Sequence, residues 1–313
     1  MTDKKLTKNE REALESYNKK LQQVRDTTRL VASGFGNGYY CWGDGGIGKS
    51  YTIISELKAM GLVEGKDWML HNTRLSGPAW FDKIDKYPSQ THMHEDIENL
   101  FIENTALNMM RSALWGQEDE DGKQERIVTY STKNPLKPGE ERRVMFTGQM
   151  IFTGNKPLEA IPELEAVSTR IEVEHPEVTR DEMLAVMKSI CIKGKKTDKG
   201  FVSPEDCLEI FRYYSTHLEA DTKLDLRILN RVFKLRLGIK KLTLKTAWER
   251  MMDRAIKQST ESQQPLTRLQ RTAKERDIAL ELKKKGLTGE ALRAEWEKRT
   301  GHKTIDAYYR RLK

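Results

Sequence analysis

Residues 43–50 read Gly-Asp-Gly-Gly-Ile-Gly-Lys-Ser and match the spacing G-x4-G-K-S in full. Glycines let the backbone curl, so that successive N–H groups point inward at phosphate oxygens. The lysine of such a loop reaches the β- and γ-phosphates of a nucleotide, and the serine hydroxyl binds its magnesium ion. We therefore predict a site for ATP and Mg²⁺ that is made of Gly43, Asp44, Gly45, Gly46, Ile47, Gly48, Lys49 and Ser50.

The sequence on either side of this loop also fits a phosphate site. An apolar stretch at 39–42 predicts a strand before the loop, and the pattern at 49–60 predicts a helix after it. The first turn of a helix carries the positive end of its dipole, which attracts phosphate. The alternative is a glycine-rich turn that arose by chance, and the strand, loop and helix in succession argue against it.

Strand and helix patterns alternate along residues 34–176, and this alternation favours a parallel sheet with helices on both faces. We predict an α/β fold of the P-loop NTPase type, then an all-helical lid at 177–256, a polar linker at 257–264 and a small three-helix module at 265–313. A long amphipathic helix at 7–32 precedes the core. The predicted strands are 68–71, 91–94, 126–130, 143–146, 149–153 and 170–174, and 124–147 reads as a hairpin insert.

A phosphate loop needs a carboxylate on a neighbouring strand to hold Mg²⁺ and to polarise the attacking water. The best candidates are Glu95 and Asp96, which follow the predicted strand 91–94, and the pattern does not decide which of them is the catalytic group. The carboxyl ends of parallel strands meet at the edge where ligands bind. The acidic run at 118–121 is a rival, but no strand pattern precedes it, so we interpret it as a solvated loop.

Two histidines interrupt this strand, which is unusual because a strand covered on both faces is normally apolar. The pattern His92-x-His94-x-Asp96 partly mimics the metal ligands of metallo-β-lactamase-like hydrolases. Ile97 stands where a further histidine is expected, and the sequence arranges no other ligand histidines to complete a site. The favoured interpretation is therefore two histidines tolerated beside a charged site.

The order of these motifs resembles that of the AAA+ ATPases over residues 34–256, and the superfamily 3 helicases share it. The resemblance implies ATP hydrolysis and assigns three further residues. Asn155, after the predicted strand 149–153, corresponds to the sensor that orients the attacking water. Arg170 corresponds to the arginine finger given to a neighbouring subunit, with a structural ion pair as the alternative. Arg227 corresponds to the sensor that contacts the γ-phosphate, with a solvated helix position as the alternative.

The net charge of +8 is concentrated at one end of the chain. Residues 265–313 hold fourteen Lys or Arg residues against seven Asp or Glu residues, so about one unit of charge is left for the rest. Such an asymmetry favours a polyanionic partner.

The module at 265–313 resembles a helix-turn-helix, whose last helix enters the major groove of DNA. The predicted DNA contacts are Lys303, Thr304, Tyr308, Arg310 and Arg311. The alternative is a basic domain that packs on the ring or binds an acidic protein.

The remaining features exclude other classes of protein. No apolar run approaches the length that a membrane span needs, and the three scattered cysteines give no disulfide framework. We therefore expect a protein of the cytoplasm, in a bacterial or virus-infected cell.

We predict an oligomeric ATPase, a ring such as a hexamer or a helical assembly, that acts on DNA. Its expected roles are motor, helicase loader, replication initiator or transposition regulator of a phage or mobile element, with a helicase or recombinase as partner. The alternatives are a nucleotide-gated switch with little hydrolysis and a small-molecule kinase.

Overall fold

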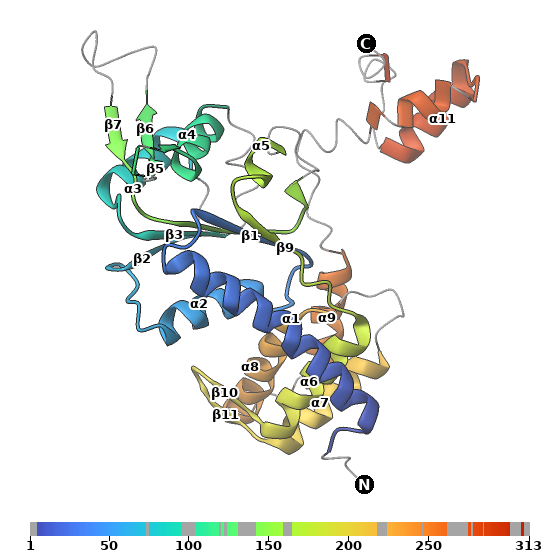
Figure 1. Ribbon diagram of the computed structural model, residues 1–313. Helices are drawn as coiled ribbons and strands as arrows, with labels where there is room; N and C mark the ends of the chain where they lie inside the picture. Colours follow the sequence, from blue (N-terminus) through green and yellow to red (C-terminus); the bar gives the residue numbers. More distant parts are fainter. Residues whose placement is uncertain are drawn as a thin grey trace. The chain divides into compact units, whose positions relative to one another are not determined.

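The computed structural model describes residues 5–72, 75–95, 104–118, 120–121, 124–130, 142–158, 165–217, 224–243, 245, 247–261, 275–276, 278–283, 285–300 and 308–309 (Figure 1). The chain forms two compact units, residues 1–249 and 250–313. The finer domain boundaries of the sequence analysis stay predictions.

A five-stranded parallel sheet forms the centre of the first unit in the part of the chain that the structure describes. The strands lie in the order β2-β3-β8-β1-β9. This arrangement confirms the predicted α/β fold of the P-loop type. The bounds are β1 Gly38–Trp42, β2 Trp68–His71, β3 Thr91–Glu95, β8 Met150–Gly154 and β9 Glu172–Glu174.

Helices cover both faces of this sheet, as the alternating pattern predicts (Figure 1). Helices α1 and α2 lie on one face, and α3 and α4 lie on the other. A capping box of Thr7 and Glu10 begins α1, which buries Tyr17, Leu21 and Val24 at helical spacing. The bounds are α1 Lys8–Ala32, α2 Lys49–Ala59, α3 Gly77–Lys86 and α4 Asn104–Leu114.

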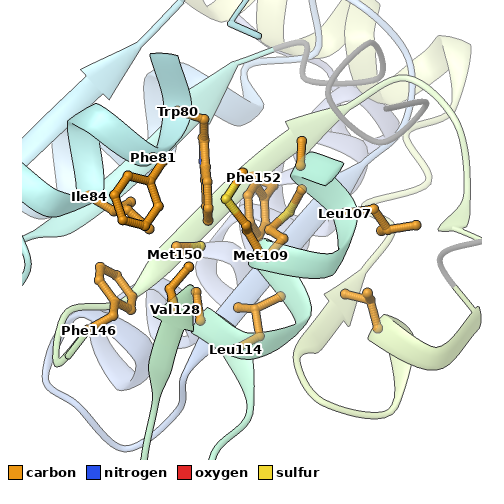
Figure 2. Close-up of a cluster of buried hydrophobic side chains, with 14 of the residues drawn as sticks. Trp80, Phe81, Ile84, Leu107, Met109, Leu114, Val128, Phe146, Met150 and Phe152 are labelled. Atoms are coloured by element: carbon orange, nitrogen blue, oxygen red, sulfur yellow. The ribbon is translucent and has the colours of Figure 1, made fainter. Parts of the chain in front are cut away.

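Large apolar side chains fill the space between the sheet and the helices α3 and α4 (Figure 2). Phe152 of β8 is fully buried among aromatic and sulfur-containing side chains from both helices. The labelled members of this cluster are Trp80, Phe81, Ile84, Leu107, Met109, Leu114, Val128, Phe146, Met150 and Phe152.

The insert at 124–147 contains a hairpin outside the main sheet, as predicted. Strand β6, Ile127–Tyr130, pairs antiparallel with β7, Arg142–Met145. Arg142 donates to Asp82 and Asp85 of α3 over 2.7 Å each, and this fixes the hairpin against that helix. A second short ribbon precedes it, formed by β4 Gln117–Glu118 and β5 Gln124–Glu125.

The segment after β9 is mostly helical, but the prediction that it is wholly helical is wrong. A hairpin of β10, Lys195–Thr197, and β11, Gly200–Val202, separates two of its helices. Gly194 and Gly200 have φ values of 72° and 134°, which a β-carbon disfavours, and so the chain turns there. The helices are α6 Arg180–Lys193, α7 Pro204–Thr216, α8 Leu226–Leu242 and α9 Trp248–Glu261, and a short α5, Glu165–Ser168, precedes β9.

The second unit has a small core of its own. Helix α11, Gly289–Thr300, packs Leu292 and Trp296 against Ile278 and Leu282 of the preceding helical segment 278–283. Arg299 of α11 pairs with Glu281 over 2.8 Å and links the two segments at the surface. Within the described residues of the whole chain, no helix combines the length and the apolar character that crossing a membrane requires.

The core in Figure 2 gives a stability prediction. We expect Phe152→Ala to lower the free energy of unfolding by about 3–5 kcal/mol, because a fully buried ring leaves a cavity. The matched control is Phe35→Ala, since this ring is 84% exposed and its loss should change stability by less than about 0.5 kcal/mol. Urea unfolding followed by circular dichroism measures both, and equal effects would contradict this core assignment.

Candidate nucleotide site

The phosphate loop lies between β1 and α2, as its sequence predicts. Its backbone needs glycine at two positions in particular. Gly46 has a φ of 78°, and a β-carbon there would lie 2.0 Å from Oδ1 of Asp225. Gly48 has a φ of 100° and is the residue before the first turn of α2. Any larger residue at position 46 would displace the carboxylate and strain the backbone.

Lys49 is the first residue of α2, and its side chain returns to the loop. Its ammonium group donates to the carbonyl oxygens of Gly43 and Asp44, over 2.7 Å each. The residue is 7% exposed, which is rare for a lysine. These contacts hold a buried positive charge at the loop, where a phosphate binds in a site of this kind.

The strand register brings oxygen groups together beside Ser50. Thr153 of β8 stands opposite Glu95 of β3, and its hydroxyl lies 3.4 Å from the hydroxyl of Ser50. Side chains alternate along a strand, so Glu95 and Thr153 share one face of the sheet. Hydroxyl and carboxylate oxygens are the ligands that Mg²⁺ prefers. Sequence reasoning missed Thr153, and Asp96 lies outside the described residues.

Tyr17 of α1 fixes the loop from the side, and sequence reasoning missed this contact as well. Its hydroxyl donates to the carbonyl oxygen of Ile47 over 2.9 Å. Burial raises the pKa of Tyr17 to about 12, so the group remains a protonated donor at neutral pH. Helix α1 also contacts the helical segment, because Lys20 pairs with Glu182 of α6 over 2.8 Å. The N-terminal helix therefore joins the loop to that segment.

The beginning of α8 lies against the loop from the other side. Asp225 caps this helix by accepting from the N–H of Arg227, and the N–H of Leu226 donates to the carbonyl of Gly46 over 3.2 Å. Arg227 forms an ion pair with Asp225 at 2.9 Å, and 72% of its side chain is exposed.

Arg227 and Asn155 come together near the loop. A β-carbon on Gly45 would lie 2.7 Å from Nη2 of Arg227 and 3.9 Å from Oδ1 of Asn155. Asn155 directly follows β8. The next residue, Lys156, accepts a hydrogen bond at its carbonyl oxygen from the hydroxyl of Tyr40 over 2.7 Å. The structure thus gathers these two residues at the phosphate loop, and their catalytic roles stay predictions.

An aromatic pair lies at the start of the loop and was not expected from the sequence. The rings of Trp42 and His175 stack with centroids 3.6 Å apart and planes 9° apart. A β-carbon on Gly43 would lie 3.1 Å from the His175 ring. Tyr39 donates to Glu174 over 2.7 Å, and this bond ties β9 to β1 beside the stack.

Arg170 lies in a different place from the loop. It lines a cavity of about 850 Å³ together with Arg111, Ser112, Trp115, Gly116 and Glu118, and its Nη1 donates to the carbonyl of Arg111 over 3.3 Å. Described residues of the phosphate loop do not line this cavity. Glu118, from the rival acidic run, lies in the same cavity. The role of Arg170 as an arginine finger stays a prediction.

The phosphate loop between β1 and α2 of a parallel sheet, with a helical segment docked on it, repeats the arrangement that the motif order implies. The fold is the parallel α/β fold of a P-loop protein. The predicted P-loop α/β fold is therefore confirmed, and a fold by itself does not assign an activity.

Comparisons with known proteins find structural similarity at low sequence identity. No protein-family model matches the sequence, and no curated protein matches it. Cdc6p from Pyrobaculum aerophilum is similar in structure, with 13% identity and a TM-score of 0.49, covering 96% of this chain and 86% of that chain. A point mutant of RuvB from Thermotoga maritima has 14% identity and a TM-score of 0.43, covering 94% and 87%. Drosophila ORC bound to DNA has 13% identity and a TM-score of 0.31, covering 95% and 74%.

One predicted DNA contact is corrected by the second unit. Tyr308 is 4% exposed and packs edge-on against Trp296, with ring centroids 5.5 Å apart. Its side chain belongs to the core of the unit and cannot reach a base. The adjacent Tyr309 is 56% exposed. The other predicted contacts, Lys303, Thr304, Arg310 and Arg311, lie outside the described residues.

The bond from Tyr17 to the loop predicts a measurable effect. We expect Tyr17→Phe to lower the free energy of unfolding by about 0.5–1.5 kcal/mol, because one buried hydrogen bond is lost and a carbonyl is left unpaired. Tyr51→Phe is the control, since Tyr51 is 78% exposed. Chemical unfolding of the two variants and the wild type tests this, and an unchanged midpoint for Tyr17→Phe would contradict it.

Proposed function

We propose that this chain binds ATP with Mg²⁺ at the phosphate loop and hydrolyses it. The observation that carries the proposal is the contact of the Ser50 and Thr153 hydroxyls next to the buried Lys49, with Glu95 beside Thr153 in the strand register. A hydroxyl, a carboxylate and a lysine in this arrangement fit a nucleotide triphosphate and its cation.

Each residue has a defined part in the proposed reaction. Lys49 holds the β- and γ-phosphates, and Ser50 and Glu95 hold the cation, which neutralises developing charge when bound. Glu95 or Asp96 polarises the attacking water, and Asn155 orients it. Arg227, held by Asp225 at the edge of the loop, contacts the γ-phosphate. These donors stabilise charge that develops in the transition state, which is the main catalytic effect in phosphoryl transfer.

We further propose that the active form is a homo-oligomer, a ring or a helical assembly. Arg170 lines a cavity without described residues of the loop, so we assign it to the nucleotide of a neighbouring copy. An arginine supplied by a second protein is a common way to complete a phosphoryl-transfer site. Hydrolysis would then depend on assembly.

We propose DNA as the partner of the basic C-terminal module. Its excess of seven positive charges favours phosphate contacts, and such contacts position a protein on DNA without reading its sequence. Lys303, Thr304, Arg310 and Arg311 remain the proposed contacts, with the exposed Tyr309 in place of Tyr308. On this basis the protein is an ATP-driven motor, helicase loader, replication initiator or transposition regulator of a phage or mobile element, with a helicase or recombinase as partner.

Steady-state ATP hydrolysis tests the enzymatic proposal. We expect Lys49→Ala to reduce the rate by at least about 100-fold, because the transition state loses a buried positive charge. Lys58→Ala is the control, since Lys58 is exposed on the same helix and should leave the rate unchanged. Tight ATP binding with no turnover by the wild type would contradict hydrolysis and favour a nucleotide-gated switch.

Binding of duplex DNA at several salt concentrations tests the partner. We expect Arg310→Ala with Arg311→Ala to weaken binding and to reduce the slope of log K against log salt by roughly two, one for each lost phosphate contact. The control removes two charges elsewhere, with Lys8→Ala and Lys19→Ala on the exposed face of α1. Equal binding by the two double variants, measured by fluorescence anisotropy, would contradict this assignment.

A further inference from the structure

Three buried histidines meet on the face of the sheet opposite Glu95 and Thr153. His71 ends β2, while His92 and His94 lie on β3, and the register places His71 directly beside His94. One ring nitrogen from each histidine lies within 4.8 Å of the other two. Their exposed fractions are 7%, 0% and 2%. The sequence shows two of these ligands, and the pairing of the strands supplies the third.

The hydrogen bonds of the rings define which nitrogens are available. Nε2 of His92 lies 2.8 Å from the carbonyl oxygen of Tyr87, and since a carbonyl only accepts, this nitrogen carries the proton. Nδ1 of His92 then accepts a hydrogen bond from Nε2 of His71 over 3.0 Å, and a metal ion would replace this bond once the proton of His71 moves to its Nδ1. Nε2 of His94 is buried without a hydrogen-bond partner among the described residues. One nitrogen of each ring therefore lies close to the other two, and His92 already has a hydrogen bond to a carbonyl at its other nitrogen.

This arrangement matches what a metal-binding histidine requires. A ligating imidazole usually donates its other N–H to a carbonyl or carboxylate, as His92 does to Tyr87. Zinc binds nitrogen at about 2.0–2.1 Å in tetrahedral geometry, which places two nitrogen ligands roughly 3.3 Å apart. The hydrogen-bond separation of 3.0 Å between Nε2 of His71 and Nδ1 of His92 is close to this value, and His94 has a ring nitrogen within 4.8 Å of the other two ligand atoms.

We propose that His71, His92 and His94 bind one divalent transition-metal ion, with Zn²⁺ as the preferred ion. Neutral imidazoles suit Zn²⁺, whereas Mg²⁺ prefers oxygen. Burial disfavours the charged form of these rings, and it lowers the pKa of His71 to about 3 and that of His92 to about 4. The ion would join β2 to β3 directly before Glu95, and it would be separate from the cation of the nucleotide site.

The alternative is a packed group of neutral rings that bind nothing. His71 stacks on His94 with centroids 4.5 Å apart, and His94 stacks on Phe152 at 5.4 Å. Such stacking explains the close packing of the rings. It does not explain a fully buried nitrogen that lacks a partner, because leaving such a group unsatisfied costs free energy. A metal ion bound through Nε2 of His94 would satisfy that nitrogen.

Metal titration of the full-length, untagged protein tests the proposal. The protein is first stripped with a chelator, and Zn²⁺ is then added in competition with a chromophoric chelator. We expect one ion per chain, a rise in the thermal midpoint on adding Zn²⁺, and no such rise on adding Mg²⁺. Co²⁺ in place of Zn²⁺ should give the absorption of a tetrahedral site with nitrogen ligands and without thiolate bands.

Variants separate this site from other ligands. We expect His71→Gln and His94→Gln each to lower the affinity for Zn²⁺ by at least about 10-fold, while His217→Gln, at an exposed position after α7, should bind as the wild type does. If one variant fails to fold, the other variant and the Co²⁺ spectrum of the wild type still test whether the histidines bind the ion. No bound ion, thiolate bands, or equal affinity in all variants would overturn the proposal, and none of these outcomes depends on ATP hydrolysis.

Discussion

The carboxylate of Asp225 lies where a side chain on residue 46 would be, and much of the first unit depends on this contact. The loop must contain glycine there, because a β-carbon would lie 2.0 Å from Oδ1 of Asp225. The same aspartate caps α8 and pairs with Arg227. Through Asp225, the loop, the beginning of α8 and Arg227 are in direct contact. On the other side, Tyr17 fixes the loop through Ile47. A nucleotide bound at this loop would contact a backbone that is already held in place.

The two faces of β3 carry different chemistry, and the alternation of side chains along a strand separates them. Glu95 shares a face with Thr153 and Ser50, where oxygen ligands suit Mg²⁺. His92 and His94 point to the other face, where nitrogen ligands gather around a buried position. The sequence of this strand, Thr91–Glu95, is unusually polar for a buried strand. In the structure each polar residue has a partner or a proposed ligand on its own side of the sheet.

Much of the fold could be predicted because the decisive patterns are local. The glycine spacing defines the loop, and the apolar periodicity places most helices and strands close to their observed bounds. The features that the sequence did not predict depend on contacts between residues that are distant in sequence. The proximity of Thr153 and of His71 follows from strand register, which the sequence does not state. The packing of Tyr308 on Trp296 depends on how short helices fold together. The hairpin after α6 depends on two glycines within a pattern that otherwise reads as helical.

The central claim is that Ser50 and Glu95 hold the cation of a bound nucleotide beside Thr153. A crystal structure with a non-hydrolysable ATP analogue and Mn²⁺ tests it most directly, because Mn²⁺ replaces Mg²⁺ and is located by its anomalous scattering. We predict one anomalous peak at the phosphates, within bonding distance of the Ser50 hydroxyl and on the side of Glu95. A nucleotide outside the loop, or a cation on the other face of β3 with none beside Ser50, would contradict the account.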